Sequence, residues 1–139
     1  MSPQRKATQS KQERLIERFE KGLQLLRDIS NDDVPIVVEG IKDITALRGL
    51  GLTGPIHALA GHNIVSLADE LADSRRLLIL FDFDRRGGQL TRHLIKQLEG
   101  RGVSVLHKER HQLRRAFCWR VRVIEGLKRI NKSPKGARF

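Results

Sequence analysis

The sequence predicts an α/β fold, in which a mostly parallel sheet of four short strands is flanked by helices. Short apolar runs alternate with amphipathic segments through about 70 central residues, a pattern typical of right-handed βαβ units. Glycines and turn residues separate these segments. The length of 139 residues, with 39% hydrophobic and 31% charged side chains, suits one folded domain with a single core.

Residues 9–29 have the pattern of an amphipathic helix. Their apolar side chains recur at steps of three and four, and Glu, Lys and Arg stand between them. These apolar residues are Leu15, Ile16, Phe19, Leu23, Leu26 and Ile29. We expect the helix to pack on the core through this face.

Four apolar runs are the predicted strands. Residues 35–38 form an unbroken apolar run after a turn, which is typical of a strand buried on both faces. Residues 77–81 are the strongest run of this kind, residues 56–59 are a weaker one, and residues 103–106 form the fourth. Together they predict the strands of the sheet.

Three helices are predicted between these strands. They cover residues 41–49, residues 63–73 and residues 87–100. Asn63 is a suitable N-cap for the second, and glycines end the first and the third. After the last strand, residues 109–130 have helical spacing, although the stretch around residues 121–123 could equally be extended.

The positive charge is concentrated in the last quarter of the chain. The net charge is +11 overall, and residues 101–139 carry twelve basic and two acidic groups of it. This segment could bind an anionic partner such as nucleic acid, or it could be merely solvated and partly disordered. With one Trp and no Tyr, base stacking is poorly served, which favours structured RNA or a duplex over long single strands. Of these partners we expect structured RNA rather than DNA. The candidate nucleic-acid-binding residues are Arg85, Arg86, Arg110, Arg114, Arg115, Arg120 and Arg122.

Composition also excludes several classes of protein. A single Cys excludes an internal disulfide framework and a cysteine-based zinc cluster, and it suits a reducing compartment. No apolar run has the length of a membrane span, and the first residues lack the apolar core of a signal peptide. We therefore expect a cytoplasmic protein without a membrane partner, which could form a homodimer.

Acidic residues follow two of the predicted strands. Glu39 comes at the end of the first strand, and Asp82 and Asp84 come at the end of the third. In the strand order 2-1-3-4 these strands are neighbours, and ligands of open parallel sheets bind at this edge. In an extended backbone Asp82 and Asp84 project to one side while Phe83 points to the other. The three carboxylates would then converge on one small volume.

Converging carboxylates repel one another, and a bound cation relieves the repulsion. Mg²⁺ is the natural candidate, because it prefers carboxylate oxygens and bridges to phosphate. The alternative is purely structural. Asp84 could be the N-cap of the next helix, the arginines at positions 85 and 86 could neutralise the aspartates, and Glu39 could be solvated.

Two segments resemble the motifs of Toprim domains. Residues 38–47, VEGIKDITAL, resemble the VEGxxDxxAL motif, and residues 80–88, LFDFDRRGG, resemble the FDxDxxG motif. The resemblance implies a single Toprim-like domain over residues 33–107, with a four-stranded sheet in the order 2-1-3-4. Residues 1–32 would then be an N-terminal amphipathic helix packed on this domain, and residues 108–139 a basic C-terminal extension.

The resemblance also implies roles for the matched residues. Glu39 would act as general acid or base and, with Asp82 and Asp84, would hold Mg²⁺. Three supporting positions follow from it: Gly40 for the tight turn after the strand, Asp43 for orienting the loop, and Gly87 for close approach of the backbone to metal and phosphate. Ile41 stands where many proteins similar to the 5S ribosomal RNA maturase have lysine, so the motif is closer to that of bacterial-type primases.

The expected function is therefore magnesium-dependent phosphodiester chemistry on nucleic acid, with endonucleolytic processing of structured RNA as the leading interpretation. Two other interpretations stay open. One is a nucleic-acid-binding or regulatory Toprim module with little or no catalytic activity. The other is nucleotidyl transfer of the kind that primases perform.

Overall fold

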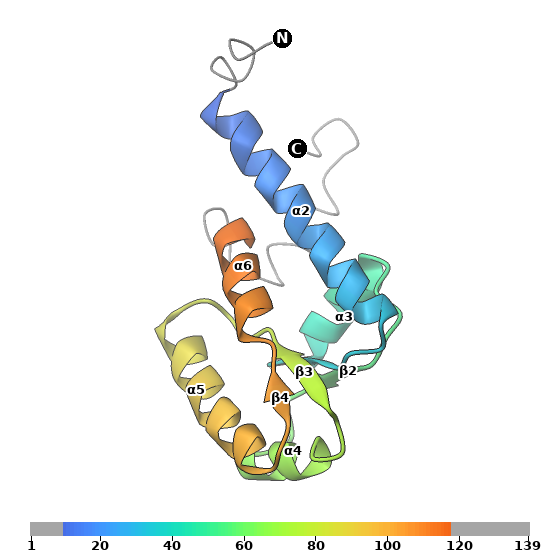
Figure 1. The fold of residues 1–139 in the computed structure, drawn as a ribbon, viewed down its shortest axis with the longest axis vertical. Helices are drawn as coiled ribbons and strands as arrows, with labels where there is room; N and C mark the ends of the chain where they lie inside the picture. The colour runs from blue at the N-terminus through green and yellow to red at the C-terminus, as the bar shows by residue number, and fades with distance from the viewer. Residues whose placement is uncertain (1–9, 118–139) are drawn as a thin grey trace.

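The computed structural model describes residues 10–117 of the chain (Figure 1). The elements in chain order are α2 (Lys11–Asn31), β1 (Ile36–Val38), α3 (Ile41–Gly49), β2 (Ile56–Ala58), α4 (Ile64–Glu70), β3 (Arg76–Ile79), α5 (Arg85–Gly100), β4 (Ser104–Val105) and α6 (His107–Phe117). The strands form one parallel sheet in the order β2-β1-β3-β4. The predicted α/β class and the strand order 2-1-3-4 are confirmed.

β1 lies in the middle of the sheet between β2 and β3. Val38 is in register with Ala58 of β2, and Val37 is in register with Ile79 of β3. All three residues of β1 are buried, as expected of a parallel strand that is covered on both faces. Because β1 and β3 are parallel neighbours, the residues that follow them meet at one edge of the sheet.

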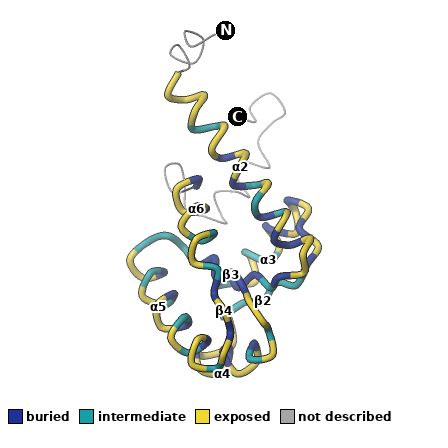
Figure 2. Tube along the Cα trace, in the orientation of Figure 1, coloured by how far each residue is buried: buried dark blue, intermediate teal, exposed yellow. Residues whose placement is uncertain are grey.

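Helices cover both faces of the sheet and create two apolar layers (Figures 1 and 2). Ile36 and Val38 pack with side chains of α2, α3 and α6, whereas Val37 packs with side chains of α4 and α5. This division follows from the alternation of side chains along a strand. Within residues 10–117, no helix has both the length and the apolar character to span a membrane.

The long helix α2 packs on the core, as its periodicity predicts. The Ser10 side chain caps its start by accepting a hydrogen bond from the Glu13 backbone N–H at 3.0 Å. The Phe19 ring lies edge-on to Phe117 of α6, with 5.2 Å between ring centroids. At Gly22 an added Cβ would come within 2.7 Å of the Ala116 Cβ, so a glycine is needed for the close approach of α2 and α6.

Several boundaries differ from those predicted. β3 ends at Ile79 rather than at residue 81, although the Leu80 N–H still donates a hydrogen bond to the Val37 carbonyl of β1 at 2.7 Å. α4 ends at Glu70, three residues early, and α6 begins at His107 rather than at residue 109. The rest of the predicted C-terminal helix, residues 118–130, lies outside the described residues. α5 begins at Arg85, two residues before the glycine at position 87 where the segment was predicted to open, and this places Asp84 at the helix start.

Candidate active site

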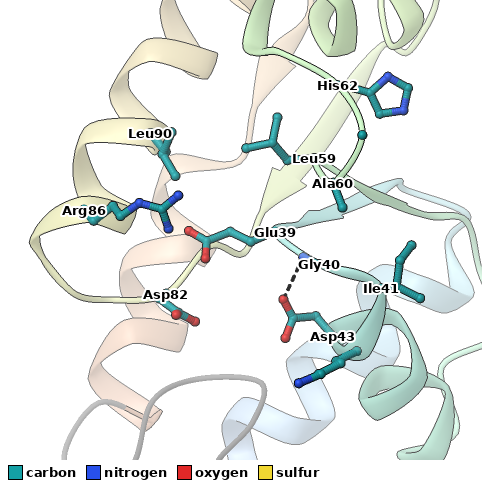
Figure 3. Close-up of a pocket in the computed structure, with 12 residues that line it drawn as sticks. Glu39, Gly40, Ile41, Asp43, Leu59, Ala60, His62, Asp82, Arg86 and Leu90 are labelled. Carbon is teal, nitrogen blue, oxygen red and sulfur yellow. Dashed lines mark hydrogen bonds between the residues drawn. The ribbon is translucent and has the colours of Figure 1, made fainter.

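Glu39 and Asp82 line one pocket at the carboxyl edge of the sheet. Glu39 directly follows β1, and Asp82 lies three residues beyond the end of β3. The cavity has a volume of about 710 Å³. Its other walls come from the start of α3, the loop after β2 and the first turns of α5: Gly40, Ile41, Lys42, Asp43, Leu59, Ala60, Gly61, His62, Arg86 and Leu90 (Figure 3). The structure thus brings two of the three predicted carboxylates together.

The carboxylate of Glu39 is electrostatically perturbed by its surroundings in this pocket. Its Oε2 is buried and has no hydrogen-bond partner. Burial raises the pKa of Glu39, and the nearby charge of Asp82 raises it further. Arg86, whose guanidinium points toward Glu39 in Figure 3, lowers that pKa in part. The smaller effects of Asp84 and Asp43 raise it again, so the net effect of these groups is a raised pKa at Glu39.

Asp43 holds the turn between β1 and α3. Its Oδ2 accepts a hydrogen bond from the Gly40 backbone N–H at 3.0 Å. Gly40 itself has an extended backbone, with φ of −132° and ψ of 168°, which any residue can adopt. An added Cβ there would make only an ordinary contact at 3.8 Å. The expectation that a tight turn requires glycine at this position is therefore wrong, because the chain turns through the cap of α3 instead.

Gly87 is required by a close approach, but to a different group from the one expected. A Cβ added at Gly87 would fall on the carbonyl oxygen of Asp82 and close to its carbonyl carbon. The absence of a side chain lets the first turn of α5 lie directly on the backbone of Asp82. Gly87 thereby permits the close packing of α5 on the backbone of Asp82.

Asp84 lies apart from the other two predicted ligands. It is the N-cap of α5, and its Oδ1 accepts a hydrogen bond from the Gly87 backbone N–H at 2.7 Å. Its side chain lines a neighbouring pocket and not the pocket of Glu39 and Asp82. Within residues 10–117, no group of three or more His, Cys, Asp or Glu side chains is placed so that it could hold a metal ion. The structural alternative for Asp84 is thus realised, although its charge still acts on Glu39.

Substitutions at Asp84 should separate capping from charge. Asp84→Ala loses the side-chain cap and should lower the free energy of unfolding by about 1 kcal/mol. Asp84→Asn removes the negative charge but keeps a side chain that caps well, so its stability should stay within about 0.3 kcal/mol of wild type. Urea unfolding followed by circular dichroism measures both. Equal destabilisation by the two variants would contradict the capping role.

The predicted basic residues divide between the two pockets. Arg86 faces the carboxylate pocket, whereas Arg85, Arg110 and Arg114 line the neighbouring one. Arg115 is exposed on α6 and lines neither pocket. The remaining two predicted positions, 120 and 122, lie outside the described residues.

The sequence analysis missed two residues of the neighbouring pocket, Thr91 and Arg92. Thr91 is buried, and its Oγ1 accepts a hydrogen bond from Arg110 Nη2 at 3.3 Å. Had the start of α5 been placed at Arg85, helical spacing would have put residues 85, 88 and 92 on one face. Nothing in the sequence indicates the contact with Arg110, which comes from a separate helix.

Comparisons with known proteins find relatives of this chain. No protein-family model matches it. It is 38% identical over 101 residues to the UPF0292 protein of Methanocaldococcus jannaschii, covering 70% of this chain and 79% of the relative. It is 34% identical over 110 residues to a UPF0292 protein of Thermococcus onnurineus, covering 79% and 80% of the two chains. A solved structure of a protein from Aquifex aeolicus is similar with a TM-score of 0.65 and 24% identity, over 76% of this chain and 94% of that one, which supports the fold alone.

Proposed function

The chain belongs to the UPF0292 family, and we propose that it is a Toprim-type enzyme that cleaves phosphodiester bonds of structured RNA with Mg²⁺. The printed names of its relatives state no activity, so the site itself carries this proposal. Its main support is the pairing of Glu39 and Asp82, which follow adjacent parallel strands and line one pocket. The two sequence motifs that resemble Toprim domains include both residues.

The residues of the pocket fit a divalent cation. Glu39 Oε2 is buried without a partner, and the neighbouring carboxylates raise the pKa of Glu39. Carboxylate oxygens with excess negative charge are the donors that Mg²⁺ prefers. Glu39 and Asp82 would hold the ion, whereas Asp84, the cap of α5, would act on the site only through its charge. When bound, Mg²⁺ neutralises charge on a phosphate and orients it for displacement.

Glu39 and Arg86 have the properties that the remaining chemistry needs. A carboxyl group with a raised pKa can take up a proton from an attacking water or donate one to a leaving oxygen. Arg86 faces the same pocket with a fixed positive charge and can bind a phosphate oxygen. Asp43 maintains the turn that carries Glu39, through its hydrogen bond to the next residue, Gly40.

Structured RNA and a cytoplasmic location belong to the same proposal. Arginines of α5 and α6 line the pocket beside the carboxylates, which suits a phosphate backbone. Few aromatic side chains are present for stacking single-stranded bases. The single cysteine suits a reducing compartment. The proposal also includes a homodimer, which light scattering can test.

The activity test compares four proteins on end-labelled RNA and DNA hairpins. The Mg²⁺ concentration is about 5 mM, which suits a site that holds the ion weakly. Wild type should cleave RNA in preference to DNA. Asp82→Asn and Glu39→Gln should each lose about 10²-fold to 10⁴-fold in rate. Glu20→Gln removes an exposed carboxylate of α2 and should cleave like wild type. Equal products from all four proteins, or none from wild type, would contradict the proposal.

The placement of Asp84 favours a second candidate, a nucleic-acid-binding module without turnover. Asp84 is engaged as the cap of α5, and the part of the chain that the structure describes offers no three-ligand group for a metal. Such a module would bind RNA in EDTA with undiminished affinity after substitution of Glu39 and Asp82, and it would release no product. Loss of binding in those variants would contradict this second candidate.

A further inference from the structure

A second pocket lies beside the carboxylate pocket and shares α5 with it. Its volume is about 480 Å³, and it is lined by Phe83, Asp84, Arg85, Gly88, Gln89, Thr91, Arg92, Ile95, Arg110 and Arg114. Arg86 and Leu90, one helical turn apart, face the carboxylates, whereas Arg85 and Arg92 face this second pocket. The first turns of α5 therefore form a ridge between the two cavities.

The second pocket has an excess of positive charge. Four arginines and one aspartate line it. The aspartate, Asp84, accepts a hydrogen bond from the backbone of α5 and caps that helix. Among residues 10–117, no carboxylate lies within ion-pair distance of any of the four arginines. This pocket is thus strongly cationic, and it lies next to a pocket lined by three carboxylates and two cationic side chains.

Arg110 is the anchored member of this group. Its guanidinium lies over the Phe83 ring, 5.2 Å from the centroid, and donates a hydrogen bond to Thr91 Oγ1 at 3.3 Å. Its Nε is buried without a hydrogen-bond partner. Burial, followed by the charge of Arg114, lowers the pKa of Arg110, although a guanidinium remains protonated. A bound anion would accept a hydrogen bond from the Arg110 Nε and would offset the positive charge of Arg114.

We propose that this arginine pocket binds a phosphate group of a nucleic-acid strand that crosses the α5 ridge. A guanidinium offers several N–H donors in a plane that matches phosphate oxygens, and ring and hydroxyl contacts orient the guanidinium of Arg110 in advance. Phosphate binding rests on the pocket alone. That a nearby phosphodiester then lies at Glu39 and Asp82 rests on the proposed function. The phosphate can be an internal diester or a terminal monoester, which arginine recognises by the same chemistry.

Binding of fluorescent hairpin RNA in EDTA tests the pocket without any catalysis. The variant Arg92→Gln/Arg114→Gln changes two exposed side chains, so its fold should be retained. The matched control is Arg75→Gln/Arg76→Gln, which removes the same charge at the start of β3, the opposite edge of the sheet.

We expect about 10-fold weaker binding for the pocket variant, with a salt dependence shallower by about 1 to 2 in log–log slope. The control should stay within about 2-fold of wild type. Equal weakening by both doubles, or none by the pocket variant, would overturn the proposal.

Arg110 and inorganic phosphate supply a second readout. Arg110→Lys keeps the charge but loses the planar donors, and it should weaken hairpin binding by about 5-fold or more. Titration of wild type with inorganic phosphate should shift the Arg110 Nε–Hε NMR signal saturably and leave the Arg76 signal unchanged. Absence of a saturable shift would overturn the proposal.

Two further arms identify the source of the phosphate and separate this proposal from the catalytic one. Preference by more than about 10-fold for a 5′-phosphorylated hairpin over its 5′-hydroxyl form would assign a terminal monoester. Equal affinity would assign a backbone diester. Pocket-dependent binding without cleavage by wild type would uphold the pocket and contradict the nuclease. Cleavage that is unchanged in Arg92→Gln/Arg114→Gln would contradict the pocket as a substrate site and leave the nuclease intact.

Discussion

Replacing Glu39 with glutamine should stabilise the metal-free protein, and in the presence of Mg²⁺ it should slow RNA cleavage by about 10²-fold to 10⁴-fold. Glutamine is nearly the same size, and it removes a negative charge that is partly buried, lacks a partner at Oε2 and faces Asp82. Because Glu39 is only half buried, we expect a gain of about 1 kcal/mol at neutral pH, or a rise in Tm of about 3 to 5 °C. Thermal denaturation followed at 222 nm in EDTA measures it, with Glu20→Gln as the control.

The gain should depend on pH in a defined direction. The folded protein raises the pKa of Glu39 above its ordinary value of 4.5, so the folded state binds this proton more tightly than the unfolded state. The contribution of Glu39 to stability is therefore best at pH values below 4.5 and is lost as pH rises through the folded-state pKa. The stability difference between Glu39→Gln and wild type should be near zero at low pH and should grow to its full value above that window. A difference that is constant with pH would contradict the buried charge.

Mg²⁺ should reduce the stability difference between Glu39→Gln and wild type. A cation that binds the folded protein between the carboxylates stabilises it by mass action. Adding Mg²⁺ should therefore raise the Tm of wild type more than that of Glu39→Gln. An equal rise in both proteins would contradict a role for Glu39 in holding the ion.

Replacing Gly87 with alanine should destabilise the protein by about 3 kcal/mol and displace Asp82. The added methyl group would fall on the Asp82 carbonyl oxygen. The atoms that it meets all belong to the Asp82 backbone, so no flexible side chain can move aside. α5 would have to move away from the segment that carries the carboxylate. Urea unfolding measures the stability, and RNA cleavage measures the second effect.

Gly88→Ala is the control for this substitution. It makes the same chemical change at the next residue of α5, where an added Cβ would meet only the end of Arg92 at 3.7 Å. Alanine is favoured over glycine inside a helix, so Gly88→Ala should raise the free energy of unfolding by about 0.5 to 1 kcal/mol. Destabilisation of both variants by similar amounts would contradict the specific clash at Gly87.

The fold was more accessible from the sequence than the arrangement of the site. Short buried strands and amphipathic helices are encoded by local spacing, and the sheet has the predicted strands and order. The pairing of Glu39 with Asp82 followed, because residues after neighbouring parallel strands meet at one edge. The sequence left two alternatives for Asp84, a metal ligand on an extended backbone or the N-cap of the next helix, and the structure has the second because α5 begins at Arg85.

By itself, the sequence determined the alternation of strands and helices, the buried central strand and the strand ends that carry Glu39 and Asp82. Periodicity and chain breakers act over a few residues, so they can be read locally. Only the tertiary structure decided that Asp84 caps α5, that Gly87 rests on Asp82, and that Arg110 of α6 lies over Phe83. These contacts depend on how helices distant in the chain pack on the sheet and on side-chain orientation at a helix start, which spacing alone does not specify.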